Sequence, residues 1–312
     1  MINSINEISD FGTTKIGVFS GISGCLYSIF HIGRILNNNE LINFVYEKVW
    51  IIKELCDSDQ SYDVVSGVSG TIGVLLSIYE HTDNIETKEL LIDTCNELYK
   101  IIKQKEIVLK DGKQITWGEE GYVGFSHGNA GVISQLIRLY EITKNEDIIK
   151  TITSSLCYEN SMFDKQKNNW RKQMEDAVYY TKWCHGAPGI LLSRLLLYKN
   201  GFINEDIKHD IYIAIEEVKN SGFGNNYCLC HGDIGNLLIL NYASLILNDE
   251  TLRIECLATV ENFIDKFFTQ SWDSGELKQT EDMSLMIGLS GVGYGLLQLF
   301  EPEVFPNILC IE

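Results

Sequence analysis

Hydrophobic residues recur at spacings of three and four along most of the chain, the pattern of helices that bury one face. The pattern is clearest in the segments 41–56, 88–104, 131–143, 189–201 and 235–247. Only three prolines occur in 312 residues, so little in the sequence interrupts long helices. The chain is therefore predicted to be mostly helical.

Two segments depart from the helical pattern. In residues 106–117, alternating hydrophobic residues flank Asp111-Gly112, a favoured two-residue hairpin turn, so we expect a small β-hairpin insertion. Residues 163–178 are polar and irregular, and we expect an exposed loop there. Neither segment is long enough to form a second domain.

A short phrase, Gly-x-x-Gly followed by a hydrophobic helical run, occurs six times. The copies are Gly21/Gly24, Gly67/Gly70, Gly128/Gly131, Gly186/Gly189, Gly232/Gly235 and Gly288/Gly291. Successive copies are 46 to 61 residues apart, enough for two helices and their connections. Glycine at a helix entry permits either a positive φ or a close approach of two backbone segments.

The repeat predicts an all-α fold built from helical hairpins, each entered through a glycine turn. A closed α/α toroid of six or seven hairpins would bring all the turns to one rim, where they can share a site. An open helical solenoid has similar building blocks, and the spacing alone leaves it open. The length allows one large domain or two ordinary ones. We interpret residues 1–312 as a single domain because the repeats run through the whole chain.

The charge balance limits the partners. With 25 basic and 43 acidic residues the chain carries a formal charge of −18, which disfavours nucleic acid and anionic membrane surfaces. The sequence contains no export signal and no apolar run long enough to span a membrane. Its nine scattered cysteines are an odd number and do not resemble a disulfide framework. We therefore expect a cytoplasmic protein with reduced thiols.

Three glycine turns carry His or Cys beside the first glycine: Ser126-His127, Cys184-His185 and Cys230-His231. Two thiolates and an imidazole, from Cys184, Cys230 and His231, are the ligands that suit one tetrahedral Zn²⁺ per chain. Three protein ligands leave the fourth position open, as a catalytic site requires. His185 is a fourth ligand, a general acid or a hydrogen-bond donor to a ligand. Cys228 is interpreted as a core or surface residue.

These phrases resemble those of the LanC-like lanthipeptide cyclases. The matching stretches are 62–67, 124–131, WCHGAPG at 183–189, CHGDIGN at 230–236, and 285–297. The WCHGAPG and CHGDIGN pair is highly specific, and the closing segment PEVFPNILCIE further resembles the C-terminal cyclase domain of class II (LanM-type) synthetases. The resemblance runs from about residue 15 to the end.

The resemblance implies an α/α toroid with a zinc ion at its mouth. It also implies a lanthionine-forming cyclase that adds peptide cysteine thiols to dehydroalanine or dehydrobutyrine in a dehydrated precursor peptide. His127 matches the family's acid/base residue. Asp63 matches an acidic residue that would orient or stabilise an imidazolium, or would instead cap a helix N-terminus. Implied partners are the precursor peptide, a dehydratase and an export transporter, with contact to the inner membrane face made through these partners.

Two other functions are compatible with the same zinc site. One is a LanC-like protein that adds glutathione to dehydroamino acids, and the other is a non-catalytic, zinc-containing scaffold that binds peptides. Substrate supply and the count of free peptide thiols would distinguish the three. Other α/α toroids, such as prenyltransferases and glycosidases, would need ligand or carboxylate sets that do not stand out in this sequence.

Overall fold

The computed structural model describes residues 15–58, 61–269, 273 and 282–312. The N-terminal segment, in which no export signal is predicted, lies outside this part. The chain divides into two compact units. Unit 1 comprises residues 1–119, 131–156 and 310–312, and unit 2 comprises residues 120–130 and 157–309. Each unit is described by itself.

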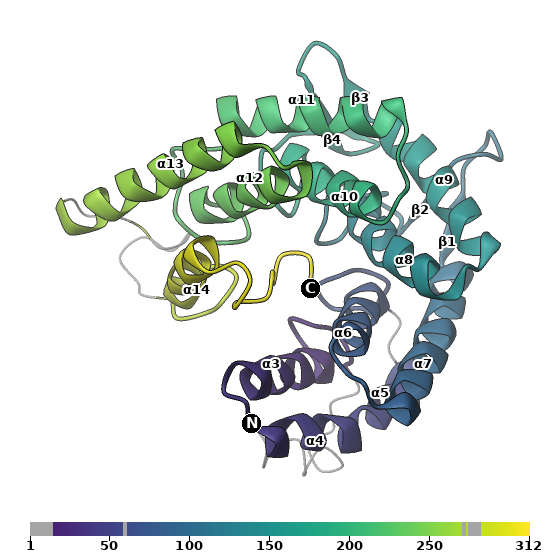
Figure 1. Cartoon of the computed structure of the whole chain (residues 1–312). Helices are drawn as coiled ribbons and strands as arrows, with labels where there is room; N and C mark the ends of the chain where they lie inside the picture. Colours follow the sequence, from purple (N-terminus) through teal and green to yellow (C-terminus); the bar gives the residue numbers. More distant parts are fainter. Residues whose placement is uncertain (1–14, 59–60, 270–272, 274–281) are drawn as a thin grey trace. The chain divides into compact units, whose positions relative to one another are not determined.

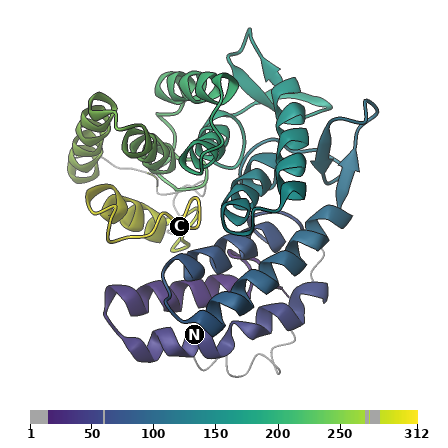
Figure 2. The same cartoon turned by 45° about the vertical axis from the view of Figure 1, so that its right-hand side comes forward.

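Unit 1 is built from helices with one small hairpin (Figures 1 and 2). Its elements in chain order are α3 (Ile22–Ile35), α4 (Asn39–Lys48), α5 (Trp50–Leu55), the 3₁₀ turn η1 (Cys56–Ser58), α6 (Val68–Glu80), α7 (Ile85–Gln104), β1 (Glu106–Val108), β2 (Ile115–Trp117), and most of α8 (Asn129–Thr143) and α9 (Glu146–Ser161). Helix α3 packs on α4 and on α6, and α6 packs on α7. This part of the chain thus forms helical hairpins, as predicted.

Unit 2 continues the same alternation of helices (Figure 1). After the start of α8 and the end of α9 it contains β3 (Phe163–Asp164), β4 (Asn169–Gln173), β5 (Asp176–Tyr179), α10 (Ala187–Lys199), α11 (Glu205–Ser221), α12 (Asp233–Leu247), α13 (Glu250–Thr269) and α14 (Leu289–Phe300). Helix α10 packs on α11 and α12, and α12 packs on α13 and α14.

The two helices of a hairpin differ in burial and in how they begin. Helices α6, α10 and α12 follow glycine turns and are buried almost all round, whereas α7, α11 and α13 bury only one stripe. The partner helices α4, α7 and α11 are capped by the side chains of Asn38, Asn84 and Asn204, which accept backbone N–H groups. The helices after glycine turns have no such side-chain cap where their first residues are described.

The predicted hairpin at 106–117 is confirmed. Strands β1 and β2 are antiparallel, with Glu106 opposite Trp117 and Val108 opposite Ile115. The carboxylate of Asp111 accepts the N–H groups of Lys113 and Gln114 in the turn.

The loop expected at 163–178 is wrong, because this segment forms the antiparallel sheet β3-β4-β5. Half-buried Phe163 pairs with Trp170, whose ring is buried, and this aromatic pair stabilises the sheet. The other strand residues are mostly polar and half-exposed, so the hydrophobic alternation of a strand is absent from the sequence.

Buried charges tie neighbouring elements together within each unit. In unit 2 the guanidinium of Arg194, fully buried on α10, lies 2.6 Å from the carboxylate of Glu159 and 2.8 Å from that of Asp210. In unit 1 Arg138 of α8 donates to the carbonyl of Ile311, 3.1 Å away, and to the carboxylate of Glu80. These contacts hold the end of α9 to α10 and α11 in unit 2, and the last residues of the chain to α8 in unit 1.

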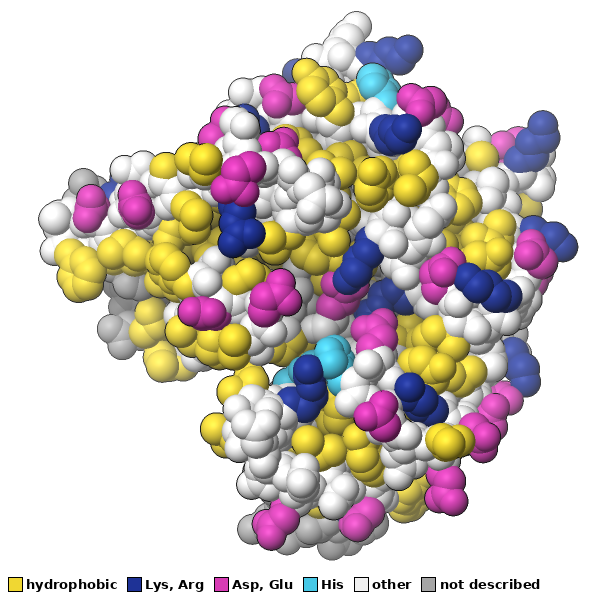
Figure 3. Space-filling model, in the orientation of Figure 1, with side chains coloured by type: hydrophobic (Ala, Val, Ile, Leu, Met, Phe, Trp, Pro, Cys, Tyr) yellow, Lys and Arg dark blue, Asp and Glu magenta, His cyan; other side chains and the backbone are white. Residues whose placement is uncertain are grey.

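Acidic and basic side chains are interspersed on the face in Figure 3, where no continuous basic patch is visible among the described side chains. None of the helices that the structure describes is long and apolar enough to cross a membrane.

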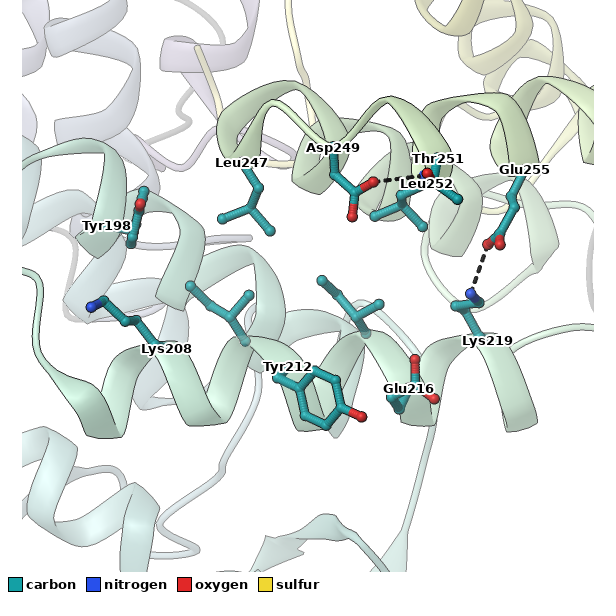
Figure 4. A pocket seen from close by; sticks show the side chains of 12 residues that line it. Tyr198, Lys208, Tyr212, Glu216, Lys219, Leu247, Asp249, Thr251, Leu252 and Glu255 are labelled. Atoms are coloured by element: carbon teal, nitrogen blue, oxygen red, sulfur yellow. Dashed lines mark hydrogen bonds and ion pairs between the residues drawn. The ribbon is translucent and has the colours of Figure 1, made fainter.

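Unit 2 also carries a groove of about 410 Å³ between α11 and α13. Its floor is apolar, with Ile211, Ile215, Leu247 and Leu252, and its rim is charged (Figure 4).

Candidate metal centre

All six glycine turns share one close backbone contact. A Cβ atom on the first glycine would overlap the carbonyl oxygen of the residue six positions earlier; this holds for Gly21, Gly67, Gly128, Gly186, Gly232 and Gly288. In five of the turns the N–H that follows this glycine donates to the same carbonyl, which satisfies a helix N-terminal donor without a side-chain cap. The glycines are therefore required for close backbone approach, and only Gly186 among these six has a positive φ, 87°.

We define a glycine turn as the seven residues that end with the first glycine of a Gly-x-x-Gly copy. Unit 2 holds the third to the sixth, residues 122–128, 180–186, 226–232 and 282–288. Equivalent backbone positions of neighbouring turns are hydrogen bonded. The N–H of Cys184 donates to the carbonyl of Cys230 (3.4 Å), and the N–H of Cys230 donates to that of Met286 (2.8 Å). The Ser126 hydroxyl donates to the carbonyl of Cys184 (3.3 Å).

This register brings the predicted ligands together. Cys184 and Cys230 both lie two residues before the first glycine of their turns, and their Sγ atoms and a ring nitrogen of His231 all lie within 4.8 Å of one another. Among the described residues no other group of three His, Cys, Asp or Glu side chains gathers in this way. The ligand atoms of a tetrahedral metal with sulfur bonds of about 2.3 Å lie about 3.7 Å apart. The three donors therefore fit one metal ion after a small inward movement.

The two thiols interact directly. A hydrogen bond from the Cys230 thiol to the Cys184 sulfur lowers the pKa of Cys184 and raises that of Cys230. Burial adds to the rise in pKa at Cys230 and opposes the fall at Cys184. A bound cation would favour loss of the thiol protons because it is a strong local positive charge.

The fourth turn holds Cys184 on a tight loop. Thr181 and Gly186 form an antiparallel bridge, and inside it the backbones of Lys182 and His185 donate to each other at 3.1 and 3.2 Å. Trp183 points into the core, where its indole N–H donates to the carbonyl of Leu309 (3.1 Å). The loop is therefore anchored by a buried ring on one side of the ligand and closed by backbone bonds on the other.

The fifth turn is held by polar side chains at the start of α12. The Asp233 carboxylate accepts the N–H groups of Gly224 and Asn225 at 2.9 and 3.0 Å. The buried amide of Asn236 donates to the carbonyl of Thr181 (2.9 Å), which precedes the Cys184 loop, and to that of Gly222 (2.6 Å). Asn236 thus connects the segments that lead into both cysteine turns. The motif CHGDIGN contains both side chains, but nothing in it indicates their partners.

His127 and His185 are placed close to the cysteines. Both are half-buried, and His127 is near enough for its charge to contribute to the electrostatic environment of Cys184 and His185. Burial lowers the pKa of His185 to about 4, so its ring is neutral at pH 7, and its Nδ1 is 3.4 Å from the carbonyl of Val123. His185 is not part of the three-residue cluster.

Two other residues singled out in the sequence have different environments. Asp63 belongs to unit 1, where its carboxylate accepts the N–H of Ser66 at 2.7 Å in the turn before α6. Ser66 precedes the helix N-cap, Gly67, and α6 has no side-chain cap, so this contact stabilises the turn and does not cap the helix. A role for Asp63 in catalysis stays a prediction. Cys228, interpreted from the sequence as a core or surface residue, is fully buried and so belongs to the core.

Comparisons with known proteins agree with these observations. A family model described as lanthionine synthetase C-like protein matches residues 1–310. The chain is 26% identical over 315 residues to the lacticin 481/lactococcin biosynthesis protein LcnDR2 of Lactococcus lactis subsp. lactis, covering 95% of this chain and 31% of that protein. It is 24% identical over 187 residues to glutathione S-transferase LANCL1 of Danio rerio, covering 60% of this chain and 45% of that protein. The chain thus spans less than half the length of these two relatives.

Solved structures show the fold class. Nisin cyclase, an α/α toroid, superposes with a TM-score of 0.76 at 18% identity, over 99% of this chain and 83% of nisin cyclase. A cellobiose 2-epimerase from Bacillus thermoamylovorans B4167 gives 0.56 at 11% identity, over 89% of this chain and 85% of the epimerase. The all-α, α/α-toroid class predicted from the glycine repeats is confirmed, and the open solenoid is not supported.

Proposed function

The chain belongs to the lanthionine synthetase C-like family, and from this premise we propose that it is a zinc-dependent lanthionine-forming cyclase. The observation that carries the proposal is the convergence of Cys184, Cys230 and His231 within 4.8 Å on adjacent glycine turns. The substrate would be a dehydrated precursor peptide, and the reaction the addition of a peptide cysteine thiol to dehydroalanine or dehydrobutyrine. We interpret residues 1–312 as one cyclase domain.

Cys184, Cys230 and His231 would hold one Zn²⁺. When bound there, zinc would supply a Lewis-acidic position that favours the thiolate form of the substrate cysteine. Two thiolate ligands already donate negative charge, so we expect the substrate sulfur to stay nucleophilic. The Cys184 and fifth-turn loops orient these donors through the backbone bonds described above, so the protein's contribution is a preorganised ligand set.

His127 is proposed as the acid/base group because it neighbours Cys184 and has an intrinsic pKa suited to both proton transfers. It would accept the proton of the incoming thiol and return it to the α-carbon after the carbon–sulfur bond forms. His185, neutral at pH 7, would shape the wall of the site. Asp63 is proposed to orient or stabilise the imidazolium form of the acid/base histidine.

Thiol counting by mass spectrometry tests the proposal. The dehydrated precursor encoded in the neighbouring genes is incubated with the zinc-loaded protein, and free thiols are alkylated. Ring closure leaves the peptide mass unchanged and removes one alkylation site per ring. Cys230→Ala should lose metal and ring closure, while Cys157→Ser, a change at an exposed cysteine, should keep both. Full activity of Cys230→Ala with zinc retained, or binding of the peptide without thiol loss by the wild type, would contradict the proposal.

One relative favours a second candidate reaction. The match to a protein named glutathione S-transferase LANCL1 supports glutathione as an alternative source of the thiol. A dehydrated peptide without cysteine distinguishes the two reactions, because only glutathione addition raises its mass by one glutathione.

The remaining partners are proposed on the same basis. A dehydratase would supply the dehydroamino acids, and a transporter would export the product. The protein would act in the cytoplasm and reach the inner membrane face through these partners.

A further inference from the structure

Two lysines and two tyrosines surround His185 next to the metal ligands. The ring of His185 lies near those of Tyr122 and Tyr180, with centroid distances of 5.5 and 6.1 Å. The ammonium of Lys172 lies 5.2 Å from the ring centroid of Tyr122, and that of Lys182 lies 5.3 Å from that of Tyr180. We call these five residues the lysine–tyrosine cluster.

Neither ammonium group is neutralised by an ion pair. In the part of the chain that the structure describes, no carboxylate lies within 4.0 Å of the ammonium of Lys172 or Lys182. Both side chains are half-buried and rest on an aromatic ring instead. Such a cation remains available to an anion that enters the site.

The two lysines differ in their place relative to the ligands. Lys182 lies two residues before Cys184 and is the first residue of the tight loop that carries this ligand, closed by the backbone bonds of Lys182 with His185. Lys172 lies on β4, outside this loop. Lys182 is therefore the lysine of the cluster that the backbone ties to the ligand loop.

The proposed reaction creates an anion at this place. As the sulfur bonds to the β-carbon, the electron pair of the carbon–carbon double bond shifts toward the carbonyl and forms an enolate. A proton from the acid then bonds to the α-carbon, and the carbonyl is restored. Resting on the proposed function, we infer that Lys182 is the catalytic residue that stabilises the enolate oxygen, with Tyr180 as the positioning residue beneath it. A fixed cation aimed at developing charge in a partly buried site is an effective stabiliser.

Three variants test this inference: Lys182→Met, Lys182→Arg and, as the matched control, Lys172→Met. Each is measured for zinc content, for the rate of ring closure at saturating dehydrated precursor, and for the Kd of the same precursor with its cysteines changed to serine. Lys182→Met should lower the maximal rate by about 10²-fold or more, as for removal of one charge-stabilising group. Zinc content and the Kd should stay at wild-type values.

The conservative variant and the control separate catalysis from structure. Lys182→Arg should recover most of the rate because the charge remains, and Lys172→Met should close rings at nearly the wild-type rate. An unchanged rate in Lys182→Met would overturn the inference, as would a loss matched by weaker peptide binding, or an equal loss in Lys172→Met. If the wild type closes no ring, the proposed function itself fails, whereas normal closure by both wild type and Lys182→Met rejects only the role of Lys182.

Discussion

On helix α14, the substitution Gly293→Ala should stabilise the protein, and Gly291→Ala should destabilise it. A Cβ at Gly291 would overlap the carbonyl oxygen of Leu285, whereas a Cβ at Gly293 meets nothing within 4 Å. Both positions lie inside the helix, so alanine gains the same helix propensity at each, about 0.5–1 kcal/mol. Gly293→Ala should therefore raise the free energy of unfolding by roughly that amount.

Gly291→Ala has the same gain in helix propensity, but its Cβ adds a steric cost. The overlapping atom is a backbone carbonyl of the sixth glycine turn, so no side-chain rotation relieves the clash. Overpacking of this kind costs about 1–3 kcal/mol, and the difference between the two variants isolates it. The next carbonyl, that of Met286, accepts the N–H of Cys230 at 2.8 Å. Displacing the turn should therefore also weaken metal binding.

Urea unfolding followed by circular dichroism measures both variants, and the midpoints are compared at equal slopes. Zinc affinity is measured by competition with a chromophoric chelator. Equal stability of Gly291→Ala and Gly293→Ala, or a Gly291→Ala protein at least as stable as the wild type, would refute the account of the glycine turns as close-approach sites.

Three further outcomes are expected. Arg194→Met should lower the free energy of unfolding by about 3–5 kcal/mol, because it leaves the buried carboxylate of Glu159 without its cation. Lys219→Met breaks a partly exposed ion pair across the groove of Figure 4 and should lower it by less than about 1 kcal/mol. Equal losses of stability in thermal melts would contradict this contrast. Asn236→Ala should weaken zinc binding by about tenfold or more in chelator competition while the helical circular dichroism is retained, and an unchanged affinity would remove its positioning role. Burial lowers the pKa of His31 from 6.5 to about 3, so the unfolded chain binds a proton at His31 more readily than the native state does. Between pH 7.5 and 5.0 the free energy of unfolding should therefore fall by about 2 kcal/mol more in the wild type than in His31→Gln, measured by urea titration. Equal falls in the two proteins would show that His31 does not titrate as described.

The sequence predicts best where one physical requirement repeats. Six glycine pairs with hydrophobic runs after them predicted helices that begin at the turns, and the helices after Gly67 and Gly232 begin at the next residue. Asp111-Gly112 predicted the hairpin because its turn chemistry is local. The sheet at 163–178 was missed because its strands lack hydrophobic alternation, and the pairing of Phe163 with the buried Trp170 joins residues that no local pattern relates.

In the candidate site, too, the residues at repeated positions could be predicted from the sequence, and the others could not. Cys184 and Cys230 occupy equivalent positions of successive turns, and backbone bonds between these positions keep any two such side chains adjacent. The repeat was therefore enough to predict the ligand cluster. Tyr122 and Tyr180 also occupy equivalent positions, the first residues of successive turns, and the rings of both lie close to that of His185. Lys172, by contrast, lies on β4, outside the turns, and its approach to the ring of Tyr122 could not be predicted from the repeat. The repeat therefore predicts which turn positions come together, but not which residues of the inserted sheet join them.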